Sequence, residues 1–583
     1  MANDILQDKK IPFWTLIGRT GKYVKSELMT IIVSLFLIAV SVFLNVVVPR
    51  ISGYYVDYID SPNPELKIIV IIAIGLIVIA LVNNGISMLE TIILTKAGQR
   101  IVYQLRMEVF SHIESMSQNQ FNDMAVGSLV TRVCNYTAQL SQFFTNVLVR
   151  VIRDVLTVVI VYVWMMTLSW ILGLFLLIIV LAVFVISFFF SKYVHKLFHK
   201  ERGQTSDLNT YLNESLSGMK VVQLFNQEKR FYDKFYRKNN DFFKTRFAIT
   251  VSFSVYRPLI SLIYILSIAL IIYVGVRLNL SSGTIVAFYL YLNYFFSPIQ
   301  NLADELNHIT RATTAMERLF NLLDISPEVI DTPDAIEIEE FKGKIEFKNV
   351  YFAYDKENWV LKNVSFVINP KETAAFVGAT GSGKTTILGL IVRNFEVQKG
   401  QILIDDIDIK KIKVESLRKA IGQMLQDVFL FSGTIKDNIT LFDDDFKENE
   451  IYDAIDYVNA RNFVDELPNK IDTMVIEKGE NFSTGQRQLI SFARTVLHKP
   501  QIMILDEATA NIDTETEVVI QKSLENIKNI GTMLVVAHRL STIQHSDKIF
   551  VLSKGEIIEE GNHQSLLKKR GYYYNLYKLQ FEE

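Results

Sequence analysis

The sequence GATGSGKTT, at Gly378–Thr386, has residue types and spacing that suit the binding of phosphate groups. It matches the pattern G-x-x-x-x-G-K-[ST], follows the strand-like segment ETAAFVG and precedes the helix-like segment TTILGLIVRNF. Glycines let a backbone bend so that its N–H groups surround phosphate oxygens at the positive N-terminus of a helix. A Gly-rich turn without function is the alternative, but the flanking strand and helix favour a phosphate-binding loop.

Within this loop, two side chains have the chemistry to contact a nucleotide and its metal ion. Lys384 is expected to reach the β- and γ-phosphates, and Thr385 to bind Mg²⁺ through its hydroxyl. The full candidate set is Gly378, Ala379, Thr380, Gly381, Ser382, Gly383, Lys384, Thr385 and Thr386.

A pair of acidic residues ends a second apolar strand, in PQIMILDEATA. Asp506 suits a contact to Mg²⁺, and Glu507 lies where a carboxylate would polarise an attacking water molecule. Paired acids at a strand end also occur in solvated turns. Because this strand follows a phosphate-binding loop in the same chain, we predict the catalytic role.

A third apolar strand, in TMLVVAHRLST, ends at His538. An isolated histidine is usually a packed or solvated residue without a catalytic function. The position of His538 at the end of a strand, at the same sheet edge as the loop and the acids, favours a contact with the γ-phosphate.

The elements that carry these residues occupy only the last part of the 583-residue chain. Half of all residues (50%) are hydrophobic and are concentrated in the first part, while Asp, Glu and Lys crowd the last part. The formal net charge of −2 predicts no nucleic-acid partner. The single cysteine, Cys134, excludes an intrachain disulfide and a Cys-based zinc site.

The first part of the chain has enough apolar sequence for six membrane-spanning helices, each of which takes about 20 residues. These stretches are Met29–Val48, Lys67–Met88, two spans within Val147–Phe190 that are broken near Thr167–Ser169, Ala248–Val276 and Gly283–Ile299. Lysine and arginine follow the second and fourth spans, so we expect both termini and two long loops in the cytosol. We expect no signal peptide; an interfacial helix and an amphipathic linker both suit the N-terminus.

The two long loops, about Thr95–Gln142 and Ser191–Thr245, combine helical periodicity with many charges. We expect helices that continue well into the cytosol before they turn back. The turns near Phe121–Gly127 and Ser206–Gly218 would present a short helix to another part of the protein, unless the loops are only solvated hairpins.

An acidic, Pro-containing segment, Ile325–Gly343, separates the apolar part of the chain from the strands that carry the phosphate-binding loop. Such a composition is typical of an interdomain linker. We expect a transmembrane domain over residues 1–324, a linker over 325–343 and a nucleotide-binding domain over 344–583.

Taken together, these residues resemble the ATP-binding cassette (ABC) exporters over nearly the whole chain. The family's motifs are matched in order and spacing by Tyr354 in VYFAY, Gln426 in GQMLQDVFLF, FSTGQ at Phe482–Gln486, IMILDE at Ile502–Glu507, ANID at Ala510–Asp513 and His538. The resemblance implies a six-helix all-α transmembrane domain with long cytosolic helix extensions, followed by an α/β P-loop ATP-binding cassette domain. It also implies ATP and Mg²⁺ as cofactors.

The same resemblance assigns roles to several residues. Glu507, His538 and Gln426 would act in hydrolysis; Tyr354 would contact the nucleotide; Thr385, Gln426 and Asp506 would hold Mg²⁺. The two loop turns would become coupling helices that rest on the nucleotide-binding domains.

A second implied contact involves the signature segment FSTGQ. In the family two cassettes pair head to tail, so each ATP lies between the P-loop of one chain and the signature helix of the other. Ser483, Gly485 and Gln486 would therefore face a nucleotide held by the partner. The family usually has leucine and glycine where this chain has Phe482 and Thr484, and a β-branched residue adds bulk at a surface that must approach phosphate closely.

An altered signature beside an intact Glu507 and His538 resembles the catalytically intact subunit of a heterodimeric bacterial multidrug exporter. That resemblance implies a second, non-identical half-transporter with an LSGGQ-like signature and a deficient Walker B motif. Neutral drift in a homodimer is the alternative.

The resemblance implies ATP-driven export of small amphipathic compounds from a bacterial cell membrane, in contact with membrane lipids. Aromatic residues of the last two spans suit such a cavity, although lipid or a neighbouring helix is the more usual partner of any single ring: Tyr264, Tyr273, Phe288, Tyr289, Tyr291, Tyr294, Phe295 and Phe296. A flippase for lipids or lipid-linked molecules would use the same ATPase. A channel or regulatory module that uses ATP only for gating is disfavoured by Glu507 and His538, and a peptidase-coupled peptide exporter by the lack of a domain before the first span.

Overall fold

The computed structural model describes the chain except residues 1–9, 356–357, 425–427, 507–513, 528–530, 537–542 and 582–583. The chain divides into two compact units. One comprises Met1–Glu114 and Met124–Ile325, and the other comprises Ser115–Asp123 and Ser326–Glu583.

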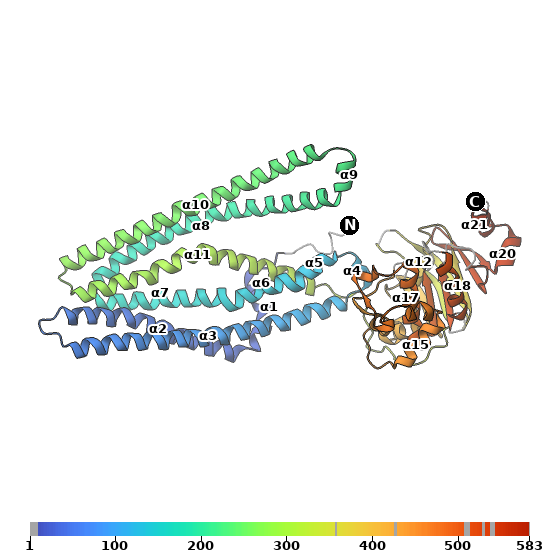
Figure 1. Ribbon diagram of the computed structural model, residues 1–583, viewed down its shortest axis with the longest axis horizontal. Helices are drawn as coiled ribbons and strands as arrows, with labels where there is room; N and C mark the ends of the chain where they lie inside the picture. The colour runs from blue at the N-terminus through green and yellow to red at the C-terminus, as the bar shows by residue number, and fades with distance from the viewer. Residues whose placement is uncertain are drawn as a thin grey trace. The chain divides into compact units, whose positions relative to one another are not determined.

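Helices make up the regular structure of the first unit (Figure 1). The long helices are α2 (Leu28–Ile59), α3 (Leu66–Glu114), α7 (Leu148–Leu168), α8 (Trp170–Ser217), α10 (Glu228–Arg277) and α11 (Ser282–Leu323). The shorter ones are α1 (Phe13–Lys25), α5 (Val126–Val130), α6 (Thr137–Gln142), α9 (Met219–Leu224) and two π-helical turns at Thr131–Tyr136 and Phe143–Val147.

Each expected membrane span lies within one of the long helices. By length and composition, four of the described helices are apolar enough to cross a membrane: α2, α3, α8 and α10. Buried apolar residues hold the bundle together, among them Val46 of α2, Val161 of α7, Ile260 of α10 and Leu292 of α11. The expected break between two spans is confirmed, because Ser169 is extended between α7 and α8.

The helices continue far beyond the apolar stretches, as expected, and the second expected turn lies at Gly218, the last residue of its predicted segment. Helix α8 continues to Ser217, through the segment predicted to turn at Ser206–Gly218, and the short helix α9 follows it (Figure 1). Contacts with α10 explain this: the ring of Tyr211 stacks on Phe231 and its hydroxyl donates to the Phe231 carbonyl at 2.8 Å. Packing against a neighbouring helix thus outweighs the weak helix preference of this Ser- and Asn-rich stretch.

The second unit contains the α/β cassette, built on three sheets. The large sheet has the order β12-β11-β3-β10-β9-β6 and a smaller one the order β2-β1-β4-β5, while β7 and β8 form a pair. The strands are β1 (Ile345–Phe352), β2 (Leu361–Ile368), β3 (Thr373–Val377), β4 (Lys399–Ile404), β5 (Ile407–Asp408), β6 (Ile421–Met424), β7 (Gly433–Thr434), β8 (Met474–Val475), β9 (Ile502–Asp506), β10 (Thr532–Val536), β11 (Lys548–Ser553) and β12 (Glu556–Gly561).

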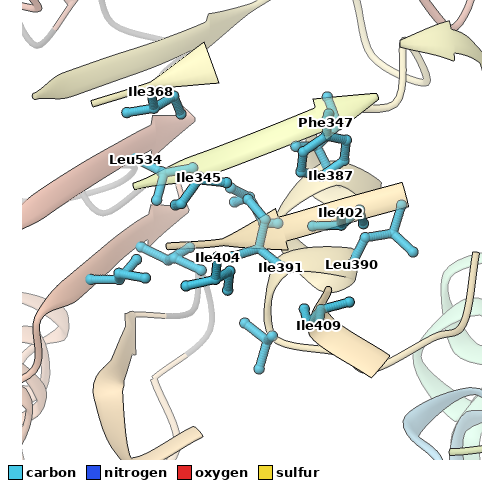
Figure 2. Close-up of a cluster of buried hydrophobic side chains, with 14 of the residues drawn as sticks. Ile345, Phe347, Ile368, Ile387, Leu390, Ile391, Ile402, Ile404, Ile409 and Leu534 are labelled. Atoms are coloured by element: carbon cyan, nitrogen blue, oxygen red, sulfur yellow. The ribbon is translucent and has the colours of Figure 1, made fainter. Parts of the chain in front are cut away.

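Helices cover these sheets on several sides. They are α12 (Lys384–Ile391), α13 (Val414–Ala420), α14 (Ile435–Thr440), α15 (Glu448–Tyr457), α16 (Arg461–Asp465), α17 (Thr484–Leu497), α18 (Thr514–Ile527), α20 (His563–Lys569) and α21 (Tyr572–Phe581). Figure 2 shows one buried cluster, in which residues of β1, β2, β4, α12 and β10 meet, including Ile345, Phe347 and Ile391. This cluster fixes α12 against the sheet, so that the N-terminus of α12 is held at the sheet edge.

Helix α4 (Gln118–Asn122) belongs to the second unit, although its neighbours in sequence belong to the first. Gln120, which is 4% exposed, donates to the carbonyl of Ser326 at 2.8 Å and accepts from the backbone N–H of Glu328 at 3.3 Å. The hydroxyl of Ser117 donates to the Glu328 carboxylate at 3.0 Å. These bonds attach α4 to the segment that leads into the cassette.

Candidate functional site

The predicted phosphate-binding loop connects β3 to the N-terminus of α12. Gly383 directly precedes α12 with a φ of +105°, and a Cβ atom there would lie 2.6 Å from the Leu361 side chain. The backbone angle therefore favours glycine, and an added Cβ atom would force the Leu361 side chain to move. Because glycine supplies no capping side chain, the first N–H groups of α12 are left to bind another acceptor.

The loop's polar side chains suit a phosphate group as that acceptor. The ammonium of Lys384 is largely buried (6% exposed) and donates to the carbonyls of Gly378 at 2.7 Å and Ala379 at 3.1 Å. The buried hydroxyl of Ser382 has no hydrogen-bond partner among the described residues. Thr385 is exposed at the first turn of α12. A buried hydroxyl without a partner among the described residues, beside a lysine and a helix N-terminus that no side chain caps, fits the oxygens of a nucleotide phosphate.

Tyr354 lies beside this loop. Its hydroxyl is 3.0 Å from that of Thr386 in α12, and its ring makes edge contacts with Phe352 and Phe395. The side chain is nevertheless 47% exposed. A ring anchored at one end and open to solvent can stack on a nucleotide base, as predicted for this residue.

The register of the large sheet brings Asp506 and the ends of the strands that precede the other predicted residues to the same edge. Parallel pairing aligns Phe376 of β3 with Val536 of β10, and Val536 with Asp506 of β9. Met424 of β6 pairs with Leu505 of β9. The carboxyl ends of β3, β10, β9 and β6 therefore share one edge, and Asp506 lies there, level with the start of the phosphate-binding loop.

The three predicted catalytic residues follow these strand ends in sequence. Gln426 comes after β6, Glu507 directly after β9 and His538 after β10. All three lie outside the described residues. Their catalytic roles stay predictions. The strands that precede them in sequence, β6, β9 and β10, end at the shared sheet edge.

The signature segment forms the N-terminus of α17, and a reciprocal capping box closes it. Ser483 accepts a hydrogen bond from the Gln486 N–H at 3.2 Å, and the Gln486 side chain accepts one from the Ser483 N–H at 2.9 Å. Gly485 is buried in the first turn. The atypical residues fit locally: Phe482 is 6% exposed in an apolar cluster, and Thr484 is exposed.

Arg487 and Arg494 of α17 have structural roles that the sequence analysis missed. Arg487 donates to the carbonyls of Gly479 at 3.2 Å and Phe482 at 3.1 Å and to the Thr484 hydroxyl at 3.2 Å, so it fixes the turn before the signature. Arg494 donates to the Asn438 carbonyl at 2.7 Å, and burial lowers its pKa. The available sequence signal was the spacing of seven residues between Arg487 and Arg494, which places both on one face of a helix.

Comparisons with known proteins agree with this arrangement. The family model of the ABC transporter transmembrane region matches residues 31–299, and the ABC transporter model of the nucleotide-binding region matches residues 361–510. A Bacillus subtilis protein described as a probable multidrug resistance ABC transporter ATP-binding/permease protein is 38% identical over 84% of this chain and 73% of its own length. An ATP-dependent lipid A-core flippase of Desulfotalea psychrophila is 35% identical over 93% of this chain and 96% of its own length.

The chain belongs to the ABC exporters. The solved structure of a bacterial Atm1-family ABC exporter with ATP bound matches it with a TM-score of 0.80 and 25% identity, over 95% of this chain and 98% of the other. The predicted fold class is therefore confirmed: a helical transmembrane domain followed by an α/β ATP-binding cassette. As an ABC exporter, the chain binds ATP and couples its hydrolysis to transport. One transmembrane region and one cassette make a half-transporter, which suggests dimerisation.

In the transmembrane unit of this exporter, the aromatic residues of α10 and α11 largely pack against other helices. Phe288, Tyr291, Phe295 and Phe296 are each at most 3% exposed, and the Tyr291 hydroxyl donates to the carbonyl of Val46 in α2 at 2.7 Å. Tyr273 and Tyr289 remain exposed at 62% and 42%. The first four rings therefore serve packing in this conformation of the chain.

Glu305 is also paired. Its carboxylate accepts from Arg150 of α7 at 2.8 Å and it is 4% exposed. The charge of Glu305 is therefore compensated by Arg150.

Proposed function

We propose that this chain is one half of a dimeric exporter that uses ATP to move small amphipathic compounds across a bacterial cell membrane. The observation that carries the proposal is the uncapped N-terminus of α12, with Lys384 and the unpartnered Ser382 hydroxyl, in the same chain as a bundle of long apolar helices. The probable multidrug resistance relative supports the substrate class. The positive-inside pattern of lysine and arginine supports cytosolic termini and a cytosolic cassette.

In the proposed hydrolytic step, Lys384 and the N–H groups of α12 hold the β- and γ-phosphates, and Tyr354 stacks on the base. Thr385 and Asp506 carry the hard oxygen donors that Mg²⁺ prefers, and Gln426 would add an amide oxygen. Bound Mg²⁺ neutralises phosphate charge. Glu507 orients and polarises the attacking water, and His538 contacts the γ-phosphate. Ser483, Gly485 and Gln486 would contact a nucleotide held by the partner.

We further propose that the partner is a different half-transporter, with an LSGGQ-like signature and without the glutamate after its Walker B aspartate. The chain combines an atypical signature residue, Thr484, with the complete predicted set Lys384, Asp506, Glu507 and His538. This combination supports two ATP sites of unequal hydrolytic activity. Apolar residues exposed on and beside α9, Val221 (58%), Leu224 (70%) and Phe225 (70%), support a surface that another chain covers.

A lipid or lipid-linked molecule is the second candidate substrate, because the Desulfotalea psychrophila relative is described as a lipid A-core flippase. A transport assay distinguishes the two candidate substrates. It uses proteoliposomes that contain the purified protein and any co-purifying chain. ATP-dependent accumulation of amphipathic dyes, absent in Glu507→Gln, is the expected result. ATP-dependent loss of headgroup accessibility of labelled lipids, without dye transport, would instead support the flippase. The absence of both activities would contradict the proposed export function.

A further inference from the structure

A basic and aromatic cavity lies in the transmembrane unit, between α8, α10 and α11. Its volume is about 670 Å³. The residues that define its chemistry are Phe198 of α8, Arg246, Phe253, Arg257 and Pro258 of α10, and Arg311 of α11. The described residues that line it include no aspartate or glutamate. The start of the expected span Ala248–Val276 falls within it, so the cavity lies where α10 passes from its charged segment into its apolar segment.

The three arginines of this cavity differ in how their charge is compensated. Arg246 forms an ion pair with Glu201 of α8 at 2.8 Å. Neither Arg257 nor Arg311 forms an ion pair in the described part of the chain. The cavity therefore presents two guanidinium groups that no described carboxylate pairs with, next to an apolar wall.

The apolar wall is held in place by the pairing of α8 with α10. Phe190 stacks on Tyr256 at a centroid distance of 3.9 Å and contacts the Phe253 ring edge-on at 5.3 Å. The hydroxyls of Tyr256 and Ser187 are 2.7 Å apart. The Arg257 guanidinium lies 5.9 Å from the Phe253 ring centroid. An aromatic surface and a charged group are thus presented together without rearrangement of either helix.

We propose that this cavity binds an anionic amphiphile: a molecule with a phosphate, sulfonate or carboxylate group next to an apolar body. Guanidinium groups pair with such anions through parallel hydrogen bonds, and the phenylalanine rings accept the apolar part. A cationic amphiphile would meet two like charges. This inference rests on the proposed export function and narrows its substrates to anions; an anionic lipid headgroup and a free organic anion share the required chemistry.

Equilibrium binding in the absence of nucleotide tests the cavity separately from transport. The full chain, with any co-purifying partner, is placed in phosphatidylcholine nanodiscs. Three probes are titrated: 8-anilinonaphthalene-1-sulfonate as a free anion, a short-chain fluorescent phosphatidylglycerol as an anionic lipid, and rhodamine 6G as a cation. Arg257→Gln/Arg311→Gln is compared with Arg237→Gln, which changes an exposed arginine of α10 outside the cavity.

The double variant is expected to weaken binding of at least one anionic probe by about tenfold or more, because it removes both guanidinium charges that pair with the anion. Rhodamine binding and the Arg237→Gln control are expected to be unchanged. Arg257→Lys/Arg311→Lys should restore part of the anion binding, because it keeps the charge but not the parallel hydrogen bonds, and this partial restoration separates charge from damage to the fold. Loss of only the sulfonate identifies a free anion, and loss of only phosphatidylglycerol a lipid.

Anion binding that is equal in the wild type and the double variant would overturn the proposal, as would equal weakening of all three probes. ATP-driven transport of cations without any anion binding would refute this inference and leave the proposed export function intact. Arginine-dependent anion binding without any transport would support this inference and contradict the proposed export function.

Discussion

Two helix N-termini of the cassette, those of α12 and α17, carry the residues predicted to contact ATP, and they are built differently. Gly383 precedes α12 at a φ of +105° and provides no cap. Ser483 precedes α17 and caps it through the reciprocal bonds with Gln486. One terminus is left open by its own sequence, while the other is satisfied within the chain.

This difference indicates which helix N-terminus gains more free energy when a phosphate binds. An uncapped helix N-terminus with a nearby lysine gains hydrogen bonds when a phosphate binds. At α17 the Ser483 hydroxyl already has a partner, so a phosphate must share or displace it. We infer that α12 is the primary nucleotide site, and that α17 contributes a weaker contact to a nucleotide that another chain holds.

The largest expected effect separates chemistry from binding at α12. Glu507→Gln should reduce ATP hydrolysis at least about a hundredfold, because it removes the carboxylate proposed to polarise the attacking water. ATP binding should persist, and nucleotide should remain trapped. Phosphate release and retention of labelled nucleotide measure the two effects, and near-normal steady-state hydrolysis would refute the role of Glu507.

The second prediction breaks the α12 site alone. Gly383→Ala places a Cβ atom 2.6 Å from Leu361, at a backbone angle that alanine rarely adopts. ATP affinity should fall by about tenfold or more, because the strain of about 1–3 kcal/mol distorts the loop. Gly381→Ala, where a Cβ atom would meet nothing within 4 Å, is the matched control and should cost less. Equal losses would show that the close packing at Gly383 is unimportant.

The third prediction concerns α17. Ser483→Ala removes the cap and should lower the stability of the helix terminus by about 1 kcal/mol. In the co-purified complex, turnover should fall less than about tenfold, and less than for the equivalent change in the partner. Asn562→Ala removes a similar capping box at α20, away from the proposed nucleotide contacts, and should affect thermal stability but not turnover. A larger turnover loss for Ser483→Ala than for the partner's equivalent would contradict unequal sites.

The smallest expected effect is a pH dependence at α20, which has a closed N-terminus and no proposed ligand. Burial lowers the pKa of His563 below its ordinary value of 6.5, and its Nδ1 lies 2.8 Å from the Tyr573 hydroxyl. Its contribution to stability is present above pH 6.5 and is lost as the pH falls through the folded-state pKa, because the unfolded chain binds the proton more readily. His563→Gln should reduce the fall in the melting temperature between about pH 7 and 5 by about 1 °C. An unchanged pH profile would refute this assignment.

Local sequence patterns predicted much of this structure because they depend on neighbouring residues. The glycine and lysine spacing indicated the loop before α12, and Ser483 with Gln486 three residues later is the pattern of a capping box. The break at Ser169 followed from a short polar interruption of a long apolar run.

Tertiary contacts set the features that the sequence did not predict. The turn expected within Ser206–Gly218 lies at the last residue of that segment, because Tyr211 packs on Phe231 of another helix and α8 continues to Ser217. Glu305 is paired with Arg150, which lies 155 positions away in the chain. The cavity of Arg257 and Arg311 depends in the same way on the packing of α8, α10 and α11. Such partners have no local signature.

The most direct test of the difference between α12 and α17 is the ATP affinity of the purified chain in the absence of a partner, for Lys384→Ala and Ser483→Ala side by side. Lys384→Ala should weaken ATP binding by about tenfold or more, since it removes the charge that opposes the phosphates. Ser483→Ala should leave the affinity within about twofold of the wild type, because in the proposed arrangement Ser483 contacts only a nucleotide held by another chain. Equal losses in both variants, or unchanged affinity in Lys384→Ala, would contradict the assignment of α12 as the primary nucleotide site.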